Sequence, residues 1–240
     1  SRFKNIQNIQ NTFIHCFFRS DAIIKNFEKL TSDKETDFSR YAFFHASYLN
    51  KQGKTNEAIR VIDRSLELTP RNLILSQFKE DINHKKNTSF SNDFHCENLS
   101  HISAELFYIV ANALSSQSAY VLSNFYLNLA KYLNPNFISF DALYAENLYM
   151  IEKFEPAKKI YKKIINSSGS IYSWHASKQI ANILREQDKE DESIKFLKDS
   201  YNKIDSSNTN KIYDYANFLK NNELFSESIK HYTRVLNLIE

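Results

Sequence analysis

The stretch that decides the fold is NEAIRVIDRSLELTP, which runs from Asn56 to Pro70. Ala58 and Ile62 lie on one side of a predicted helix, and a proline closes the stretch, a pattern that a single amphipathic helix would also produce. The question is whether the pattern recurs along the chain. A repeated helical unit builds an extended surface that can hold another molecule, whereas one helix says little about function.

Small residues recur along the chain at a nearly constant spacing. In each copy, an alanine in a first helix is followed by a leucine after three residues and by a second alanine or a serine after twelve. The first-helix alanines are Ala46, Ala111, Ala145, Ala181 and Ala216, and the second-helix residues are Ala58, Ser123, Ala157, Ser193 and Ser228. From Ala111 onward the alanines are 34, 36 and 35 residues apart. Five copies in register indicate a repeated helix–turn–helix unit.

The composition agrees with an all-α protein. The chain has 240 residues, of which 42% are hydrophobic and 25% are charged, as is typical of a soluble globular protein. It has only two glycines and three prolines, too few for the tight turns of a multi-stranded sheet. The net charge of +3 is too small to indicate a nucleic-acid partner. The apolar stretches are short and interrupted, so we expect no transmembrane segment.

The repeated unit resembles the tetratricopeptide repeat, a unit of about 34 residues with small residues at its eighth and twentieth positions. Small side chains there let the two helices of a repeat approach closely. The resemblance covers about residues 39–70 and 104–240. It implies an all-α fold in which tetratricopeptide-type helical hairpins form a right-handed superhelix, or solenoid.

The later repeats also resemble those of bacterial, particularly alphaproteobacterial, tetratricopeptide proteins, some of which are thought to be exported. The cytoplasm is the default location, and this resemblance makes the periplasm or cell envelope the alternative. Cys16 and Cys96 fit no metal or redox spacing and predict neither a disulfide framework nor a compartment. Because the chain begins at Ser1 and stops at Glu240 within a helical pattern, we expect a fragment of a longer protein.

The repeat frame divides the chain into four parts. Residues 1–38 are predicted to form a divergent helical hairpin with a turn near Arg19. Residues 39–83 are predicted to form one repeat and a single helix of a degenerate second repeat. Residues 84–103 are polar, and we expect an irregular loop where a second helix should stand. Residues 104–240 are predicted to form four contiguous repeats, the third to sixth of the chain.

The resemblance also suggests where a partner would bind, because five positions of each first helix face the concave groove in the tetratricopeptide family. Glu105 occupies one of these positions in the third repeat. The residues predicted to bind a peptide in the groove are Asn112, Glu146, Tyr149, Lys178, Asn182, Arg185, Tyr213, Asn217 and Lys220.

Three asparagines, Asn112, Asn182 and Asn217, occupy the same groove position in their repeats. An amide side chain both donates and accepts hydrogen bonds, which suits it to holding the backbone of an extended peptide. The alternative is that these polar residues are simply solvated, because asparagine is abundant in this chain. Lys178 and Asn182 also match part of a carboxylate clamp, but Asp214 stands where the clamp needs an asparagine and would repel a carboxylate.

Other candidate sites are weaker. His84, His95, Cys96 and His101 could supply zinc ligands, but their spacing fits no known motif, so we predict no metal and no cofactor. A second group consists of lysines that could bind phosphate but are better explained as a solvated helix face: Lys158, Lys159, Lys162 and Lys163. Tyr172 and Trp174 are interpreted as core residues.

No nucleophile with a base, phosphate loop or carboxylate pair stands out, so we predict no catalytic residues and no enzyme activity in this chain. The prediction is a non-catalytic scaffold or adaptor that binds a peptide or protein segment in its groove. The alternative is that the chain is a docking or regulatory arm of a larger enzyme, such as a transferase, whose catalytic domain lies elsewhere in the protein.

Overall fold

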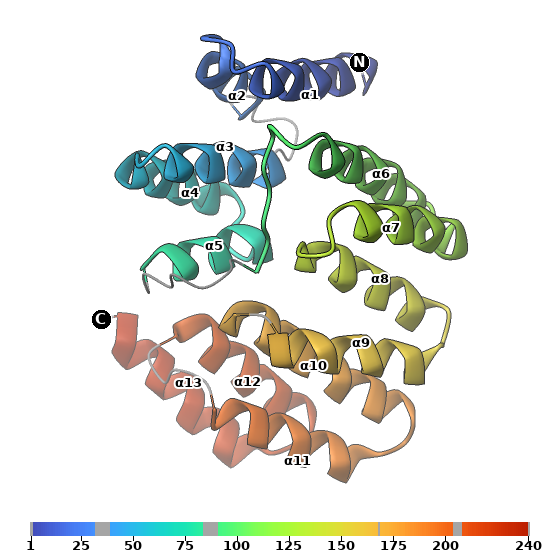
Figure 1. The fold of residues 1–240 in the computed structure, drawn as a ribbon. Helices are drawn as coiled ribbons and strands as arrows, with labels where there is room; N and C mark the ends of the chain where they lie inside the picture. Colours follow the sequence, from blue (N-terminus) through green and yellow to red (C-terminus); the bar gives the residue numbers. More distant parts are fainter. Residues whose placement is uncertain (1, 32–38, 84–90, 168, 204–207, 240) are drawn as a thin grey trace. The chain divides into compact units, whose positions relative to one another are not determined.

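The computed structural model describes residues 2–31, 39–83, 91–167, 169–203 and 208–239. These residues form thirteen α-helices and no β-strand (Figure 1), which confirms the predicted all-α fold. The helices are α1 (Arg2–Phe17), α2 (Ile23–Thr31), α3 (Ser39–Lys51), α4 (Thr55–Leu68), α5 (Leu73–Asn83), α6 (Leu99–Ser116), α7 (Tyr120–Leu133), α8 (Ile138–Met150), α9 (Phe154–Ser167), α10 (Ser170–Glu186), α11 (Glu190–Tyr201), α12 (Thr209–Asn221) and α13 (Phe225–Ile239).

The chain divides into two compact units, which are described separately. Unit 1 is Ser1–Glu152 and contains α1 to α8, and unit 2 is Lys153–Glu240 and contains α9 to α13. In unit 1, α1 packs on α2, α3 on α4, α6 on α7 and α7 on α8. In unit 2, α10 packs on both α9 and α11, and α12 packs on α13. Sequential helices therefore pack as neighbours within each unit, as the repeat pattern predicts.

The turns of the repeats share one backbone conformation at one position. Seven residues after each first-helix alanine, φ is positive; these residues are Gly53 (76°), Ser118 (61°), Glu152 (57°), Asp188 (57°) and Glu223 (60°). In the turns at Gly53, Ser118, Asp188 and Glu223, the next N–H bonds back to the carbonyl of the repeat leucine, as from Ala119 to Leu114 and from Lys189 to Leu184, both 2.9 Å. Arg19, with φ of 51°, makes a similar turn between α1 and α2, where the turn was predicted. The turns therefore support the register deduced from the sequence.

Serine replaces alanine at the second small position of three repeats without leaving its hydroxyl unpaired. A buried hydroxyl must find a hydrogen-bond partner, and here each Oγ donates across the helix pair to the carbonyl of the first-helix alanine. The bonds run from Ser123 to Ala111 (2.8 Å), from Ser193 to Ala181 (2.7 Å) and from Ser228 to Ala216 (2.9 Å). All six residues are buried, so the close helix approach is kept.

Residues 91–98, here called the strap, connect to α6 as an extended chain (Figure 1). Asn98 caps α6 by accepting a hydrogen bond from the Ser100 N–H (2.9 Å), so α6 begins at Leu99, inside the range predicted to be irregular. Upstream, Asn92 Oδ1 accepts hydrogen bonds from the Ser139 N–H (3.0 Å) and hydroxyl (2.9 Å) at the start of α8. An antiparallel bridge joins Asn92 and Phe137. Hydrogen bonds thus hold the strap against the start of α8.

Aromatic side chains from separate elements of unit 1 meet around the strap. Phe94 lies 4.2 Å from Phe44 of α3 and 5.6 Å from Phe13 of α1, measured between ring centroids. Phe137, just before α8, lies 5.9 Å from Phe43 and 4.8 Å from Phe140. Because all these rings are buried, the strap helps to form the core between α1, α3 and α8.

A buried ion pair also joins α3 to α6. The Arg40 guanidinium donates to both carboxylate oxygens of Glu105, at 2.7 and 2.6 Å, and its Cζ lies 3.6 Å from the centroid of the Tyr108 ring. Glu105 is only 1% exposed, so its predicted place in an open groove is wrong. Burial raises the pKa of Glu105, and Arg40 acts in the opposite direction. The carboxylate holds unit 1 together rather than meeting a ligand.

Unit 2 has a smaller core that follows the repeat. Trp174, Ala181 and Leu197 pack with Tyr215 and Leu219, and all five are buried. Tyr172, 2% exposed, is buried as well, so the interpretation of the aromatic pair as core residues is confirmed. Within the described ranges, no helix is long and apolar enough to cross a membrane.

Candidate functional site

In unit 2, a polar contact joins the two first helices that carry most of the predicted site. Lys178 Nζ on α10 lies 2.5 Å from Asp214 Oδ2 on α12, and the Trp174 indole donates a hydrogen bond to the same oxygen (3.2 Å). Asp214 is therefore held between a cation and an N–H donor. The pair ties α10 to α12 and reduces the repulsion that Asp214 was expected to exert on an anionic ligand.

On α10, Lys178, Asn182 and Arg185 follow one another at intervals of four and three residues, which places them on one side of the helix. Lys178 and Asn182 are half-buried, and Arg185 is exposed. His175 lies on the same side, and its pKa is lowered to about 4 by burial and, to a smaller extent, by the charge of Lys178. This side of α10 therefore carries its positive charge on Lys178 and Arg185.

On α12, Tyr213, Asn217 and Lys220 share one side in the same way. The Tyr232 hydroxyl of α13 donates to Asn217 Oδ1 (2.7 Å), and the rings of Tyr213 and Tyr232 meet edge to face at 5.7 Å. Tyr213 is still 41% exposed, and Lys220 is exposed. The Asn217 amide is thus oriented by the second helix of its own repeat.

Together, these six residues form what we call the α10–α12 face: Lys178, Asn182, Arg185, Tyr213, Asn217 and Lys220. The sequence had named the residues but not their partners Asp214 and Tyr232. Those partners lie on the neighbouring helices, and the spacing of a repeat does not specify which side chains meet there. The face combines amides, cations and a tyrosine, which is suited to contacts with a peptide backbone and with acidic side chains.

The other three predicted site residues lie in unit 1. Asn112 on α6 and Glu146 on α8 are exposed, and Tyr149 on α8 is half-buried. Beside them, Asn147 is fully buried; its amide donates to Ser123 Oγ and to Asn124 Oδ1, both 2.8 Å. This neighbouring asparagine therefore has a structural role between α7 and α8, while the predicted site residues face outward.

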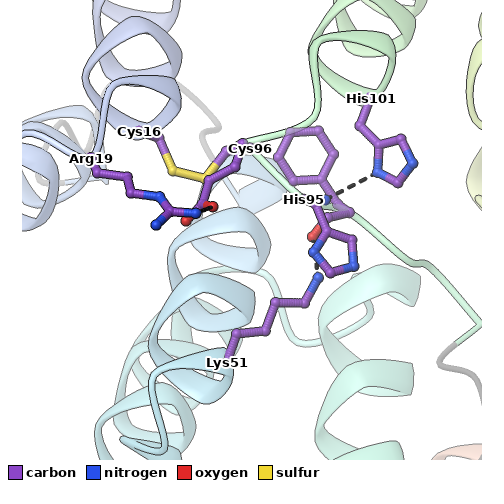
Figure 2. Close-up of a disulfide and its surroundings, with 8 residues drawn as sticks. Cys16, Arg19, Lys51, His95, Cys96 and His101 are labelled. Atoms are coloured by element: carbon purple, nitrogen blue, oxygen red, sulfur yellow. Dashed lines mark hydrogen bonds and ion pairs between the residues drawn. A yellow bond between two sulfur atoms is a disulfide. The ribbon is translucent and has the colours of Figure 1, made fainter.

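The strongest local feature that the sequence did not reveal is a disulfide between Cys16 of α1 and Cys96 of the strap (Figure 2). Their Cα atoms are 5.7 Å apart, although 80 residues separate them in the sequence. Arg19 pairs with Glu97 next to this bond (2.5 Å). Lys51 Nζ donates to the Phe94 carbonyl (2.6 Å) and lies 3.3 Å from Asp93. These contacts hold the strap to α1 and α3.

A cavity of about 240 Å³ lies beside the disulfide. It is lined by Phe44, Tyr48, Lys51, Gln52, Phe94, His95, Cys96 and Glu97. Burial lowers the pKa of Lys51, and Asp93 acts in the opposite direction. Because Lys51 already bonds to the strap, we assign the cavity a structural role and no ligand.

The zinc interpretation of the strap is disfavoured by the state of its cysteine. Cys96 is bonded to Cys16 and offers no thiolate, and His84 lies outside the described residues. The backbone N–H of His95 donates to His101 Nδ1 (3.1 Å), as Figure 2 shows. Over the ranges that the structure describes, no group of three or more histidine, cysteine or acidic residues is arranged to hold a metal.

The lysines of α9 were the remaining candidates. Lys158 Nζ lies 2.6 Å from Glu155 and donates to the Gln187 side chain at 3.1 Å. Lys159, Lys162 and Lys163 are exposed on the same helix. The pairing of Lys158 fits the interpretation of this face as a solvated helix surface.

No protein-family model matches the chain, and no curated protein matches it. Among solved structures, it is similar to a kinesin light chain protein with nearly identical TPR-like repeats from Podospora anserina (11% identity, TM-score 0.44, 84% of this chain and 95% of that chain). It is also similar to MamA of MSR-1 (12%, 0.30, 82% and 94%) and to the TPR domain of P58(IPK) (16%, 0.28, 97% and 74%). The solved structures that this chain resembles thus include tetratricopeptide repeat proteins.

Proposed function

We propose that the chain is a non-catalytic scaffold that binds an extended, acidic segment of a partner protein on the α10–α12 face. The observation that carries this proposal is the ion pair of Lys178 with Asp214, reinforced by Trp174. It joins the two first helices of the face, and it compensates the acidic side chain that would otherwise oppose an acidic ligand.

Each part of the face has a role in this proposal. The amides of Asn182 and Asn217 hydrogen-bond the ligand backbone, and Tyr232 holds the Asn217 amide in place before the ligand arrives. Arg185 and Lys220, both exposed, pair with acidic side chains of the ligand. Tyr213 provides apolar contact. Such a preorganised face loses little side-chain freedom on binding.

The proposal is tested with an array of acidic and charge-matched basic peptides, followed by calorimetry on the strongest binder. Arg185→Glu with Lys220→Glu should weaken binding of the acidic peptide at least tenfold, which corresponds to about 1.4 kcal/mol. The control is Lys159→Glu with Lys195→Glu, which makes the same change in charge on α9 and α11. Equal losses in both variants, or a preference for basic peptides, would refute a specific acidic site.

The contribution of the amides is tested separately from that of the charges. Asn182→Ala removes an amide that the proposal assigns to the ligand rather than to the fold. The fold should therefore be retained, while peptide affinity falls about threefold to thirtyfold. Peptide binding that is independent of Asn182 would limit the proposal to its charged residues.

We also infer that the protein works in an oxidising compartment, such as the periplasm or another extracytoplasmic space. The support is the Cys16–Cys96 disulfide, since such bonds persist mainly where thiols are not kept reduced. Thiol alkylation of the protein in intact cells, followed by mass spectrometry, should find the two cysteines linked. Two alkylated, unlinked cysteines would point to the cytoplasm.

A further inference from the structure

The repeats of this chain allow an internal comparison of the surfaces of their second helices, which are α4, α7, α9, α11 and α13. The residue fourteen positions after the first-helix alanine is exposed in all five helices. In four of them it is basic: Arg60, Lys159, Lys195 and Lys230. In α7 it is Phe125, which is 57% exposed. The helix face that is basic and solvent-exposed in the other repeats is therefore apolar in α7.

The same exception extends along the whole of α7. We call its apolar residues the α7 stripe: Val121, Leu122, Phe125, Leu129 and Tyr132. Val121 is 71%, Leu122 49% and Tyr132 86% exposed, and Leu129 is half-buried. At the position of Leu129, the other repeats carry Arg64, Lys163, Asp199 and Arg234. At the position of Tyr132, they carry Glu67, Asn166, Asn202 and Asn237. An exposed apolar stripe of this kind marks an interaction surface more often than a solvated one.

The sequence that contains most of the stripe has no charged residue. No charged residue occurs between Leu106 and Ala130. Lys131 is directed to its own chain, because its Nζ pairs with Asp141 (2.5 Å) and lies 4.7 Å from the centroid of the Tyr144 ring. Like charges that meet across a twofold axis repel each other, and a charge-free stripe avoids this cost when two copies associate.

The order of residues in the stripe indicates the geometry of such a contact. Suppose that two α7 helices lie antiparallel, and that the twofold axis passes between them at the level of residue 127. Along the helix, residue i of one copy then lies at the level of residue 254 − i of the other. Phe125 then faces Leu129, and Leu122 faces Tyr132. Four of the five stripe residues thus meet an apolar partner.

We propose that the α7 stripe is the interface of a homodimer in which two copies of the chain pack α7 against α7 in antiparallel orientation. Its few side chains provide less than the roughly 800 Å² per partner of a standard interface, so the dimer should be weak and concentration-dependent. The interface lies on unit 1 and is independent of the proposed α10–α12 face.

Sedimentation velocity over about 5 to 500 µM tests the proposal, because interfaces of less than standard size associate in this range. The wild-type chain should shift from monomer to dimer. Phe125→Lys, which introduces the residue found at this position in α9, α11 and α13, should weaken association at least tenfold with unchanged helicity by circular dichroism. Tyr132→Asn, which copies Asn166 and Asn202, provides a second variant that the repeat tolerates.

The matched control is Ile229→Lys on α13, where Ile229 is 63% exposed. It introduces the same charge at an exposed apolar position outside the stripe and should leave association unchanged. A chain that stays monomeric at all concentrations, or a dimer that loses as much affinity with Ile229→Lys as with Phe125→Lys, would overturn the proposal.

Mixing two variants tests the antiparallel register. Phe125→Lys and Leu129→Glu should each associate weakly alone, but together they should regain association, because the introduced lysine of one copy would face the introduced glutamate of the other. A mixture that stays monomeric would exclude this register. Phospholipid vesicles that bind the wild-type chain but not Phe125→Lys, in the absence of any self-association, would instead identify the stripe as a membrane-binding surface.

Discussion

In unit 2, the packing of the repeat holds the helices together. α9 to α11 pack in sequence, small residues lie where paired helices approach each other, and the core uses similar positions in successive repeats. In unit 1, the strap occupies part of the segment between α5 and α6, and the elements are joined by a disulfide, a buried ion pair and an aromatic cluster. The difference shows that a degenerate repeat can be tolerated when specific bonds replace the lost helix packing. Unit 1 should therefore be sensitive to the loss of its disulfide and of its buried ion pair.

The largest expected effect comes from breaking the buried pair of Arg40 and Glu105. Glu105→Ala leaves a buried guanidinium without its partner and should lower the free energy of unfolding by about 3–5 kcal/mol, measured by urea denaturation. Arg40→Met with Glu105→Leu should recover most of the loss, because both charges are then gone. In unit 2, Lys198 and Glu227 form an exposed pair (3.7 Å), and Lys198→Ala should change stability by less than about 0.5 kcal/mol. Similar effects at both pairs would contradict the comparison.

The next largest effect should come from the disulfide. Reducing the Cys16–Cys96 bond, or replacing both cysteines by serine, should cost about 2–4 kcal/mol of stability, because the unfolded chain is no longer closed into a loop. Thermal melts with and without a reductant measure the effect. The Cys16→Ser, Cys96→Ser double variant serves as the control and should not respond to the reductant. A wild-type melting temperature that is the same in both conditions would show that the bond adds nothing to unit 1.

Acid should destabilise unit 1 through His45. Its side chain is buried against Phe27, and burial lowers its pKa to about 4. In the unfolded chain the imidazole takes up a proton near its ordinary pKa of about 6.5, so the stabilisation is complete above that pH and is lost as the pH falls toward 4. The loss should reach about 3 kcal/mol, since each pKa unit corresponds to about 1.36 kcal/mol. His45→Ile, which copies Ile180 of unit 2, should reduce the pH dependence by that amount.

Urea denaturation at several values between pH 4 and pH 7 measures this difference between the variant and the wild-type chain. His175 in unit 2 also has a pKa lowered to about 4, so part of the slope should remain in the variant. An unchanged slope would mean that His45 can be protonated without cost to the fold.

The smallest effects concern the turns, where both units should behave alike. Gly53 has φ of 76°, and the space that an alanine Cβ would occupy is open, so Gly53→Ala should cost about 1 kcal/mol through the backbone alone. Asp188 has the same kind of turn with φ of 57°, and Asp188→Gly should stabilise unit 2 by about 0.5–1 kcal/mol. Thermal melts of the two variants provide the test. Shifts of the same sign would show that the shared turn register does not control their energetics.

The period of small residues predicted the pairs α3–α4, α6–α7, α10–α11 and α12–α13 and their turns, because close packing and chain reversal depend on residues near one another in the sequence. It could not predict the Cys16–Cys96 bond or the Arg40–Glu105 pair, which join positions 80 and 65 residues apart. Glu105 was predicted to face the groove because the repeat frame assumes that a regular repeat precedes α6. In the structure, Arg40 of α3 contacts Glu105 instead. In unit 2, the frame could not predict that Asp214 and Tyr232 would contact residues of the proposed α10–α12 face, because these contacts depend on side chains of neighbouring helices.

The strap also has a consequence for the order in which unit 1 folds. In an ordinary repeat array each repeat contacts only its neighbours, so the ends can fray while the middle remains folded. Here the strap connects α1, α3 and α8 at once, through Cys96, Phe94 and Asn92. Helix α1 cannot detach without disturbing the start of α8, more than a hundred residues later in the chain. Unit 1 should therefore unfold in one cooperative step, with slow formation of its long-range contacts.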